Sequence, residues 1–275
     1  MKGKKSNIVI YILLVILAVI FLAPIFIILF NSFKGKLYIS DAPFKLPTAE
    51  TFVGVQNYID GLSKTGFLSA FGWSIFITFF STIVIVLFTS MTGWYITRAK
   101  NKVSTVLYFI FVFSMIVPFQ MVMFTMSKVA NMLSLDNPIG LIVLYLGFGA
   151  GLSIFMFSGF VKSIPIDIEE AALIDGCNPI KTFFLIVLPL LKPICITVAI
   201  LNVMWIWNDY LLPSLVLKSD YKTIPMAVQY LRGGYGAIDM GAMMAVLVLA
   251  IIPIIIFYLT CQKYIIEGVA AGAVK

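Results

Sequence analysis

The sequence predicts an all-α integral membrane protein with six transmembrane helices, and three observations support this fold class. Of the 275 residues, 61% are hydrophobic and 11% are charged, whereas soluble domains are about 45–50% apolar and about 25% charged. The apolar residues gather in six long runs, and a helix needs about 20 of them to cross a bilayer. One stretch between the runs, within residues 162–192, has helical polar patterning.

Composition also excludes several classes of function. The chain has no histidine, which removes His-dependent catalytic triads and His metal sites. Cys177, Cys195 and Cys261 are scattered and form no C-x-x-C pair, so neither a zinc site nor a disulfide framework is expected. The net charge is +7, but the basic residues are spread along the chain. This suits cytoplasmic lysines of a membrane protein and disfavours nucleic-acid binding.

The first apolar run covers residues 8–30 and follows Lys2, Lys4 and Lys5. A signal peptide has about 7–15 apolar residues before a small-residue cleavage site. This run is longer and lacks such a site, so we expect a retained membrane helix, kinked at Pro24. The other expected spans are residues 68–96, 103–126, 139–161, 193–212 and 241–261.

The connections between the spans differ in length and polarity. Residues 31–67 form a long, turn-rich outer segment, and residues 127–138 form a short outer turn. Pro118 interrupts the third span, which neighbouring helices can tolerate. In the fourth span, Gly147 and Gly151 make a G-x-x-x-G face, which predicts the close approach of another helix.

Six spans place both termini on one side of the membrane. The short connection after the second span carries Arg98, Lys100 and Lys102, which favours the cytoplasm. We therefore expect both termini and residues 162–192 in the cytoplasm, with the chain in a bacterial plasma membrane.

Residues 162–192 are the longest stretch with helical polar patterning. Pro165 is suited to the first turn of a helix, and negative charge is favoured there by the helix dipole. The acids that follow are Asp167, Glu169 and Glu170. Gly176 is expected to end this helix in a left-handed conformation.

A second helix is expected to begin at Asn178, as N-cap, with Pro179 at its first position. Apolar residues then recur at i, i+3, i+4 and i+7, which predicts one buried face. These residues are Ile180, Phe183, Phe184 and Val187. Pro189 and Pro193 are expected to close the segment.

These two helices contain a longer motif. The pattern E-A-A, three residues, G, nine residues, I-x-L-P is formed by Glu170, Ala171, Ala172, Gly176, Ile186, Leu188 and Pro189. It resembles the cytoplasmic coupling loop of permease subunits of binding-protein-dependent ATP-binding-cassette importers. The resemblance implies the type I importer permease fold, a single permease domain over residues 1–275 and no enzymatic activity. The alternative is an amphipathic helical hairpin without a partner.

The resemblance also assigns roles within this loop. It implies that Glu170 forms a salt bridge or hydrogen bonds with an ATP-hydrolysing subunit. Ala171, Ala172 and Gly176 would allow that subunit to approach closely. Asp175 lies at the glycine corner, where it contributes to docking or caps the helix locally.

The end of the fifth span suggests a substrate. Its polar and aromatic residues are Asn202, Trp205, Trp207, Asn208, Asp209 and Tyr210. They resemble the W-N-D-(F/Y)-L-L-P run of carbohydrate-uptake permeases, and aromatic faces with amide or carboxylate groups suit a sugar. Ionisable residues within membranes are often functional. The alternative, an aromatic belt with helix packing, stays open.

The C-terminal residues indicate a narrower class. Residues 262–264 and 267–275 resemble the closing Q-(R/K)-Y…G-(L/V)-(T/A)-A-G-A-V-K of the maltose/oligosaccharide branch. The resemblance implies the second, shorter permease of an ATP-driven sugar importer. Its partners would be a homologous permease, two ATP-binding subunits and an extracellular sugar-binding protein. ATP and Mg²⁺ would bind to the partner ATPases, because this chain has no G-x-x-x-x-G-K-(S/T) motif.

A sugar importer has three alternatives. The coupling loop alone leaves open an importer for another solute. An ion-coupled secondary transporter would require buried carboxylate relays and inverted repeats. A membrane enzyme would require a nucleophile–base pair or metal ligands. The sequence shows none of the features that the last two require.

Overall fold

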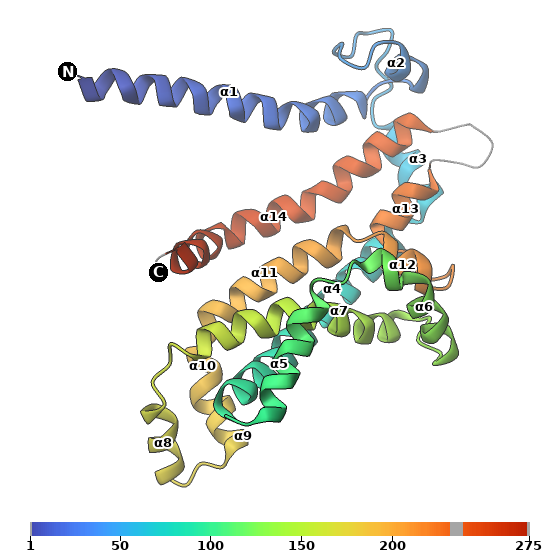
Figure 1. Cartoon of the computed structure of the whole chain (residues 1–275). Coiled ribbons are helices and arrows are strands. Elements are labelled where there is room, and N and C mark those ends of the chain that lie inside the picture. The colour runs from blue at the N-terminus through green and yellow to red at the C-terminus, as the bar shows by residue number, and fades with distance from the viewer. Residues whose placement is uncertain (1, 232–238, 274–275) are drawn as a thin grey trace. The chain divides into compact units, whose positions relative to one another are not determined.

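The computed structural model describes residues 2–231 and 239–273, and these are mostly helical (Figure 1). Within the described residues there is no β-sheet, only an isolated antiparallel bridge between Lys34 and Phe52. The chain divides into two compact units, Met1–Ala70 with Ala227–Ile255 and Phe71–Met226 with Ile256–Lys275. The predicted all-α class is confirmed.

The first unit begins with α1 (Lys2–Asn31), which continues through Pro24. The most apolar part of this helix contains no buried residue. A helix that is hydrophobic all round is normally surrounded by lipid or by other protein. This unit also contains α2 (Lys36–Asp41), α3 (Gln56–Thr65) and the first part of α14 (Met240–Ala273).

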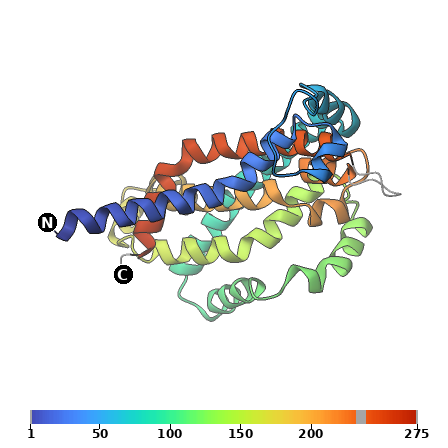
Figure 2. The ribbon, with the colours of Figure 1, turned by 90° about the horizontal axis from the view of Figure 1, so that it is seen from above.

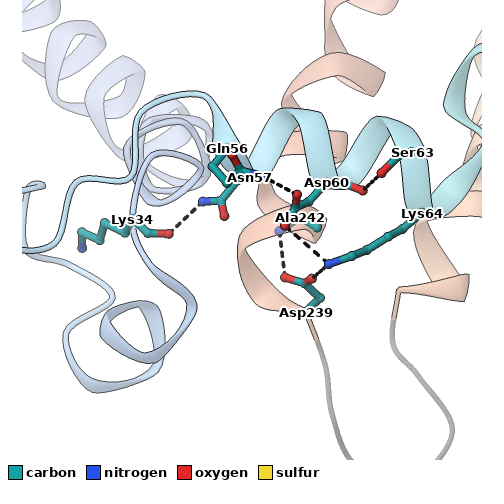
Figure 3. Close-up of polar contacts among 8 residues, drawn as sticks. All are labelled: Lys34, Gln56, Asn57, Asp60, Ser63, Lys64, Asp239 and Ala242. Atoms are coloured by element: carbon teal, nitrogen blue, oxygen red, sulfur yellow. Dashed lines mark hydrogen bonds and ion pairs between the residues drawn. The ribbon is translucent and has the colours of Figure 1, made fainter.

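The outer segment after α1 is held together by buried polar side chains. The Asn57 amide donates to the carbonyls of Ser32 and Lys34, both at 2.8 Å; Figure 3 shows the bond to Lys34. Lys34 is only 2% exposed. Its Nζ donates to the Ala42 carbonyl at 2.9 Å and lies 5.1 Å from the centroid of the Phe30 ring. Burial lowers the pKa of Lys34.

In the same unit, α3 lies against the start of α14. A Cβ at Gly61 would come within 3.0 Å of the Ala242 carbonyl oxygen, so the helices are close. Lys64 Nζ also donates to Asp239 Oδ2 at 2.6 Å (Figure 3). This hydrogen bond raises the pKa of Lys64. Burial acts to raise the pKa of Asp239, but the bonds from Lys64 and the Ala242 amide outweigh it, and the pKa is lowered.

The second unit is built around α7 (Pro138–Val161), which contacts α5 (Lys102–Ser114) and α11 (Lys192–Asn208) (Figures 1 and 2). This unit also contains most of α4 (Phe67–Arg98), α6 (Phe119–Met132), α12 (Leu211–Val216) and the start of α13 (Ile224–Tyr230).

The glycines of α7 follow the sequence prediction in part. A Cβ at Gly151 would lie 2.8 Å from the Phe111 carbonyl oxygen of α5, so the predicted close approach is right at this residue. A Cβ at Gly147 would meet nothing within 4 Å, so the prediction is wrong there. The reason is that α5 ends at Ser114, beside Gly151, and does not extend to the next turn of α7.

The third apolar run is not a straight helix. Its two parts, α5 and α6, meet at 105° (Figure 2). Pro118 precedes α6 as its N-cap residue, where a missing N–H is harmless. The predicted outer turn over residues 127–138 is also shorter than expected, because α6 continues to Met132.

The number of membrane crossings depends on the bent helices. The described residues contain four helices that are long and apolar enough to cross a membrane. The count rises to six if each of two bent pairs is one span, α5 with α6 and Pro179–Leu190 with Lys192–Asn208. Six spans at the expected boundaries therefore stay a prediction.

Candidate functional site

The segment predicted as a coupling loop, residues 162–192, contains α8 (Asp167–Ile174), whose first turn carries the three predicted acids. Pro165 was expected inside this turn, and that expectation is wrong. The N-cap position belongs to Ile166, whose carbonyl accepts from the amides of Glu169 and Glu170 at 2.9 and 3.0 Å. Pro165 precedes the cap, in the connection from α7.

The glycine corner after α8 has the predicted geometry. Gly176 has φ +83°, the left-handed region in which glycine is favoured. Its amide donates to the Leu173 carbonyl at 3.1 Å, and the Cys177 amide donates to the Ala172 carbonyl at 2.9 Å. These bonds satisfy carbonyls at the helix end. A Cβ at Gly176 would meet nothing within 4 Å, so the backbone conformation alone requires glycine here.

The second helix begins where predicted and then changes form. Asn178 Oδ1 accepts from the Lys181 amide at 2.9 Å, and Pro179 is the first residue of α9 (Pro179–Thr182). A π-helical turn η1 (Phe183–Val187) and α10 (Leu188–Leu190) follow. Pro189 therefore lies in a continuing helix, and the chain bends by 77° before α11.

The predicted apolar face of this segment is only half right. Phe183 and Val187 are buried, but Ile180 is 66% exposed and Phe184 is also exposed. Ile180 lies in α9, before the π-helical turn. The buried apolar residues of the segment are Phe183, Val187 and Leu191.

The two neighbouring glutamates of α8 point to opposite sides. Glu169 is 6% exposed and accepts from both Nε and a terminal nitrogen of Arg98, at 2.9 and 2.7 Å. Its other oxygen accepts from Trp94 Nε1 at 2.9 Å. Arg98 also donates to the Ile164 carbonyl at 2.9 Å. We call this set of Trp94, Arg98 and Glu169 the glutamate clamp; it fixes α8 to the end of α4.

Sequence analysis missed the clamp, because Arg98 was assigned only to a basic connection. One signal was present. Glu169 and Ala172 are three residues apart, which places them on one helix face, and both are buried.

The opposite face of α8 is open. Glu170, Ala171, Asp175 and Gly176 are all exposed, as expected for a docking surface. Large apolar side chains lie among them, and Ile174 is 86% exposed. Ala172 is buried and does not belong to this surface. Ile186 and Leu188 are half-buried, and Pro189 is exposed, further along the same segment.

Asp209 is held by local bonds at the end of α11. Its Oδ2 accepts from the Tyr145 hydroxyl at 3.0 Å. Its Oδ1 accepts from the amides of Leu211 and Leu212, at 2.9 and 3.4 Å. The carboxylate therefore caps α12 and ties it to α7.

The other predicted path residues divide into two groups. Asn202 and Trp207 are buried; Asn202 donates to the Val198 carbonyl at 2.8 Å, and Trp207 packs edge-on against Phe71. Trp205, Asn208 and Tyr210 are exposed. Within the second unit, Asn202 and Trp207 are therefore packing residues, whereas the other three side chains are accessible.

The remaining sequence signals are less informative. The backbone of α14 is helical to Ala273, but the side chains from residue 265 onward lie outside the described residues, as do those of Lys2, Lys4 and Lys5. Across the residues that the structure describes, no group of three or more Cys, Asp or Glu side chains is arranged to hold a metal ion.

Two known proteins are similar to this chain over almost its whole length. The "Probable starch degradation products transport system permease protein AmyC" of Thermoanaerobacterium thermosulfurigenes is 39% identical over 95% of this chain and 94% of its own length. The "Multiple sugar-binding transport system permease protein MsmG" of Streptococcus mutans is 35% identical over 96% of each chain.

A solved structure has the same fold. It belongs to a bacterial ABC transporter involved in the import of the acidic polysaccharide alginate. The similarity covers 96% of this chain and 98% of the other, with a TM-score of 0.79 and 24% identity. Residues 87–270 match the family described as the binding-protein-dependent transport system inner membrane component. The chain belongs to this family of inner-membrane permease components.

Proposed function

We propose that this chain is the transmembrane subunit of an ATP-driven importer that carries a carbohydrate, most specifically an oligosaccharide, across the plasma membrane. Three relatives support the substrate class. Two are named for starch degradation products and for multiple sugars, and the third, MelC of Bacillus subtilis, is named for melibiose, raffinose and stachyose. The family is one of transport permeases, not enzymes. An importer for a non-sugar solute is not favoured by these relatives.

The proposed assembly has five parts. This chain pairs with a homologous permease, and two ATP-binding subunits dock on the cytoplasmic side and hold ATP and Mg²⁺. An extracellular sugar-binding protein delivers the substrate. The unburied apolar surface of α1 supports extensive contact with lipid or with the other permease. Both termini and residues 162–192 then lie in the cytoplasm.

The observation that carries this proposal is that α8 has one side bound to α4 and another side exposed. Its inward carboxylate, Glu169, is fixed to Arg98, while Glu170 and Ile174 face outward. When the ATP-binding subunits close, a docked α8 would be pulled with them. The glutamate clamp would transmit that movement to α4, which leads into the membrane.

The first prediction concerns the substrate. Deleting the gene for this chain should abolish growth on, and uptake of, one or a few oligosaccharides, while uptake of amino acids stays normal. A panel of radiolabelled mono- and oligosaccharides, with an amino acid and a peptide as controls, measures this. Loss of amino-acid or peptide uptake with normal uptake of every sugar would contradict the proposed substrate class.

The second prediction concerns the glycine corner. Gly176→Val should lower sugar-stimulated ATP hydrolysis by at least tenfold, because a β-branched residue at φ +83° costs about 1–3 kcal/mol. Gly176→Asn is the matched control, since asparagine tolerates the left-handed region. The readouts are co-purification of the ATP-binding subunit and hydrolysis in proteoliposomes. Full stimulation in Gly176→Val would exclude this corner from coupling.

The third prediction concerns the glutamate clamp. Breaking a buried ion pair by removing one partner costs about 3–5 kcal/mol. Glu169→Gln should therefore loosen α8 and lower stimulated ATP hydrolysis, while the ATP-binding subunit is still retained through the unchanged outer face. Glu170→Gln should instead weaken that retention.

Asp167→Asn is the control for the clamp, because it removes an exposed acid from the same first turn. The measurement compares retained ATP-binding subunit with hydrolysis rate in each variant. If Glu169→Gln and Asp167→Asn behave alike and both keep full stimulation, the clamp does not transmit movement.

We also propose that the exposed residues at the end of α11 face the sugar path. Aromatic faces and amides suit sugar hydroxyls and rings, and Trp205 and Asn208 present both to the surface. Asp209, Asn202 and Trp207 would support this surface through the bonds and packing described above. Trp205 itself packs edge-on against Tyr145, with ring centroids 5.4 Å apart.

The fourth prediction separates contact from packing. Trp205→Ala should lower the maximal rate of sugar uptake at unchanged amounts of assembled complex, because it removes an exposed ring. Trp207→Ala should lower the amount of complex itself, because burial of such a ring contributes about 3–5 kcal/mol to stability. Uptake normalised to complex in native membranes tests both. An equal loss of complex in the two variants would show that Trp205 also acts through packing, and would contradict its place in the sugar path.

A further inference from the structure

A basic cavity lies in the second unit where the end of α4, the start of α5 and the end of α7 meet. Its volume is about 790 Å³. Three lysines line it, Lys100, Lys102 and Lys162, and no acidic side chain is among its lining residues. Among the described residues of this unit, the buried acid Glu169 is already bound to Arg98. The cavity is therefore positively charged and carries no carboxylate of its own.

The start of α5 adds hydrogen-bond donors to this charge. Asn101 caps the helix by accepting from the Ser104 amide at 2.8 Å, and the remaining amides of a first helical turn have no partner within the helix. Such a terminus attracts anions.

A buried hydroxyl provides independent evidence for a ligand. Ser104 lines the cavity and is only 2% exposed, and its hydroxyl oxygen is buried without a hydrogen-bond partner among the described residues. Buried polar groups are normally paired. The neighbouring Ser158 hydroxyl, by contrast, already donates to the Gly93 carbonyl at 3.4 Å.

Lys162 is held in place over the wall of the cavity. Its Nζ lies 5.9 Å from the centroid of the Tyr108 ring, a cation–π distance. This contact directs a lysine at the end of α7 toward α5. The three ammonium groups thus come from two sides of the cavity, α7 on one side and the α4–α5 connection on the other.

An apolar groove continues from the cavity along α5. It has a volume of about 490 Å³ and shares Val106 and Phe109 with the basic cavity. Its lining is otherwise apolar: Ile110, Val112, Phe113 and Ile116. A ligand that fills both parts needs an anionic head and a hydrocarbon chain.

We propose that the basic cavity and this groove together bind one anionic phospholipid. The phosphate would lie between Lys100, Lys102 and Lys162 at the start of α5, and an acyl chain would follow Val106 and Phe109. Basic pockets between membrane helices commonly bind anionic head groups. A free phosphate would leave the groove empty, which is why the structure favours a lipid. This inference is independent of the transported substrate.

The test uses the whole purified transporter with its partner subunits. Binding of phosphatidylglycerol is measured by native mass spectrometry after titration, with phosphatidylcholine and inorganic phosphate as separate probes. The triple variant Lys100→Gln, Lys102→Gln, Lys162→Gln should bind phosphatidylglycerol about a hundredfold more weakly, because each lysine near a membrane surface contributes about fivefold. Ser104→Ala should weaken it by about fivefold.

The control removes the same charge elsewhere. Lys45→Gln, Lys128→Gln, Lys263→Gln replaces three exposed lysines that do not line the cavity and should bind phosphatidylglycerol like the native transporter. Equal weakening in the two triple variants would overturn the proposal, and so would unchanged affinity in Ser104→Ala.

Two further outcomes would also overturn the proposal. Inorganic phosphate that displaces phosphatidylglycerol at equal concentration would identify a site for free anions. Phosphatidylglycerol that binds the isolated chain but not the complete transporter would show that another subunit covers the groove. Preference for phosphatidylglycerol over phosphatidylcholine, lost only in the cavity variants, supports the lipid site.

Discussion

The buried ion pair between Arg98 and Glu169 fixes α8 to the end of α4, and the arrangement of residues 162–192 depends on it. Removing two charges from water is costly unless each finds good hydrogen bonds. Here the guanidinium donates to Glu169 and to the Ile164 carbonyl, and Trp94 satisfies the second carboxylate oxygen. Both carboxylate oxygens of Glu169 therefore have partners, and these bonds hold α8 against the end of α4. Glu170 and the apolar end of the helix are exposed, so the surface that we propose for docking depends on a contact made by the buried side of α8.

The features of residues 162–192 that could be predicted from the sequence are those that depend on neighbouring residues in the chain. Gly176 ends a helix, and Asn178 with Pro179 starts one, because backbone sterics and a cap three residues away decide both. The clamp could not be found in the same way, because its partners are 71 residues apart. The apolar face failed for another reason. Apolar spacing shows which residues share a helix face but not how far a neighbouring element covers that face, and here Ile180 and Phe184 stay exposed.

The positions of the helices could be predicted from the sequence, but the bends between them could not. Apolar run length predicted that residues 68–96 and 139–161 are helical, and α4 and α7 cover them. Run length carries no information about direction, so neither the 105° bend between α5 and α6 nor the 77° bend before α11 was expected. Pro118 marked one break. The other break lies at Leu191, which is buried and stands between Pro189 and Pro193.

Polar side chains in such an apolar chain mostly bind nearby backbone. Asn202 and Asn208 each donate to a carbonyl four residues earlier, and Asp209 accepts from two amides that follow it. These bonds give each group a structural role that its residue type alone does not reveal. A group without such a bond is therefore more informative. Ser104 is buried without a partner beside three lysines that share their cavity with no carboxylate. Because leaving a buried hydroxyl unpaired costs about 1–3 kcal/mol, an anion that supplies the missing acceptor would stabilise this end of α5.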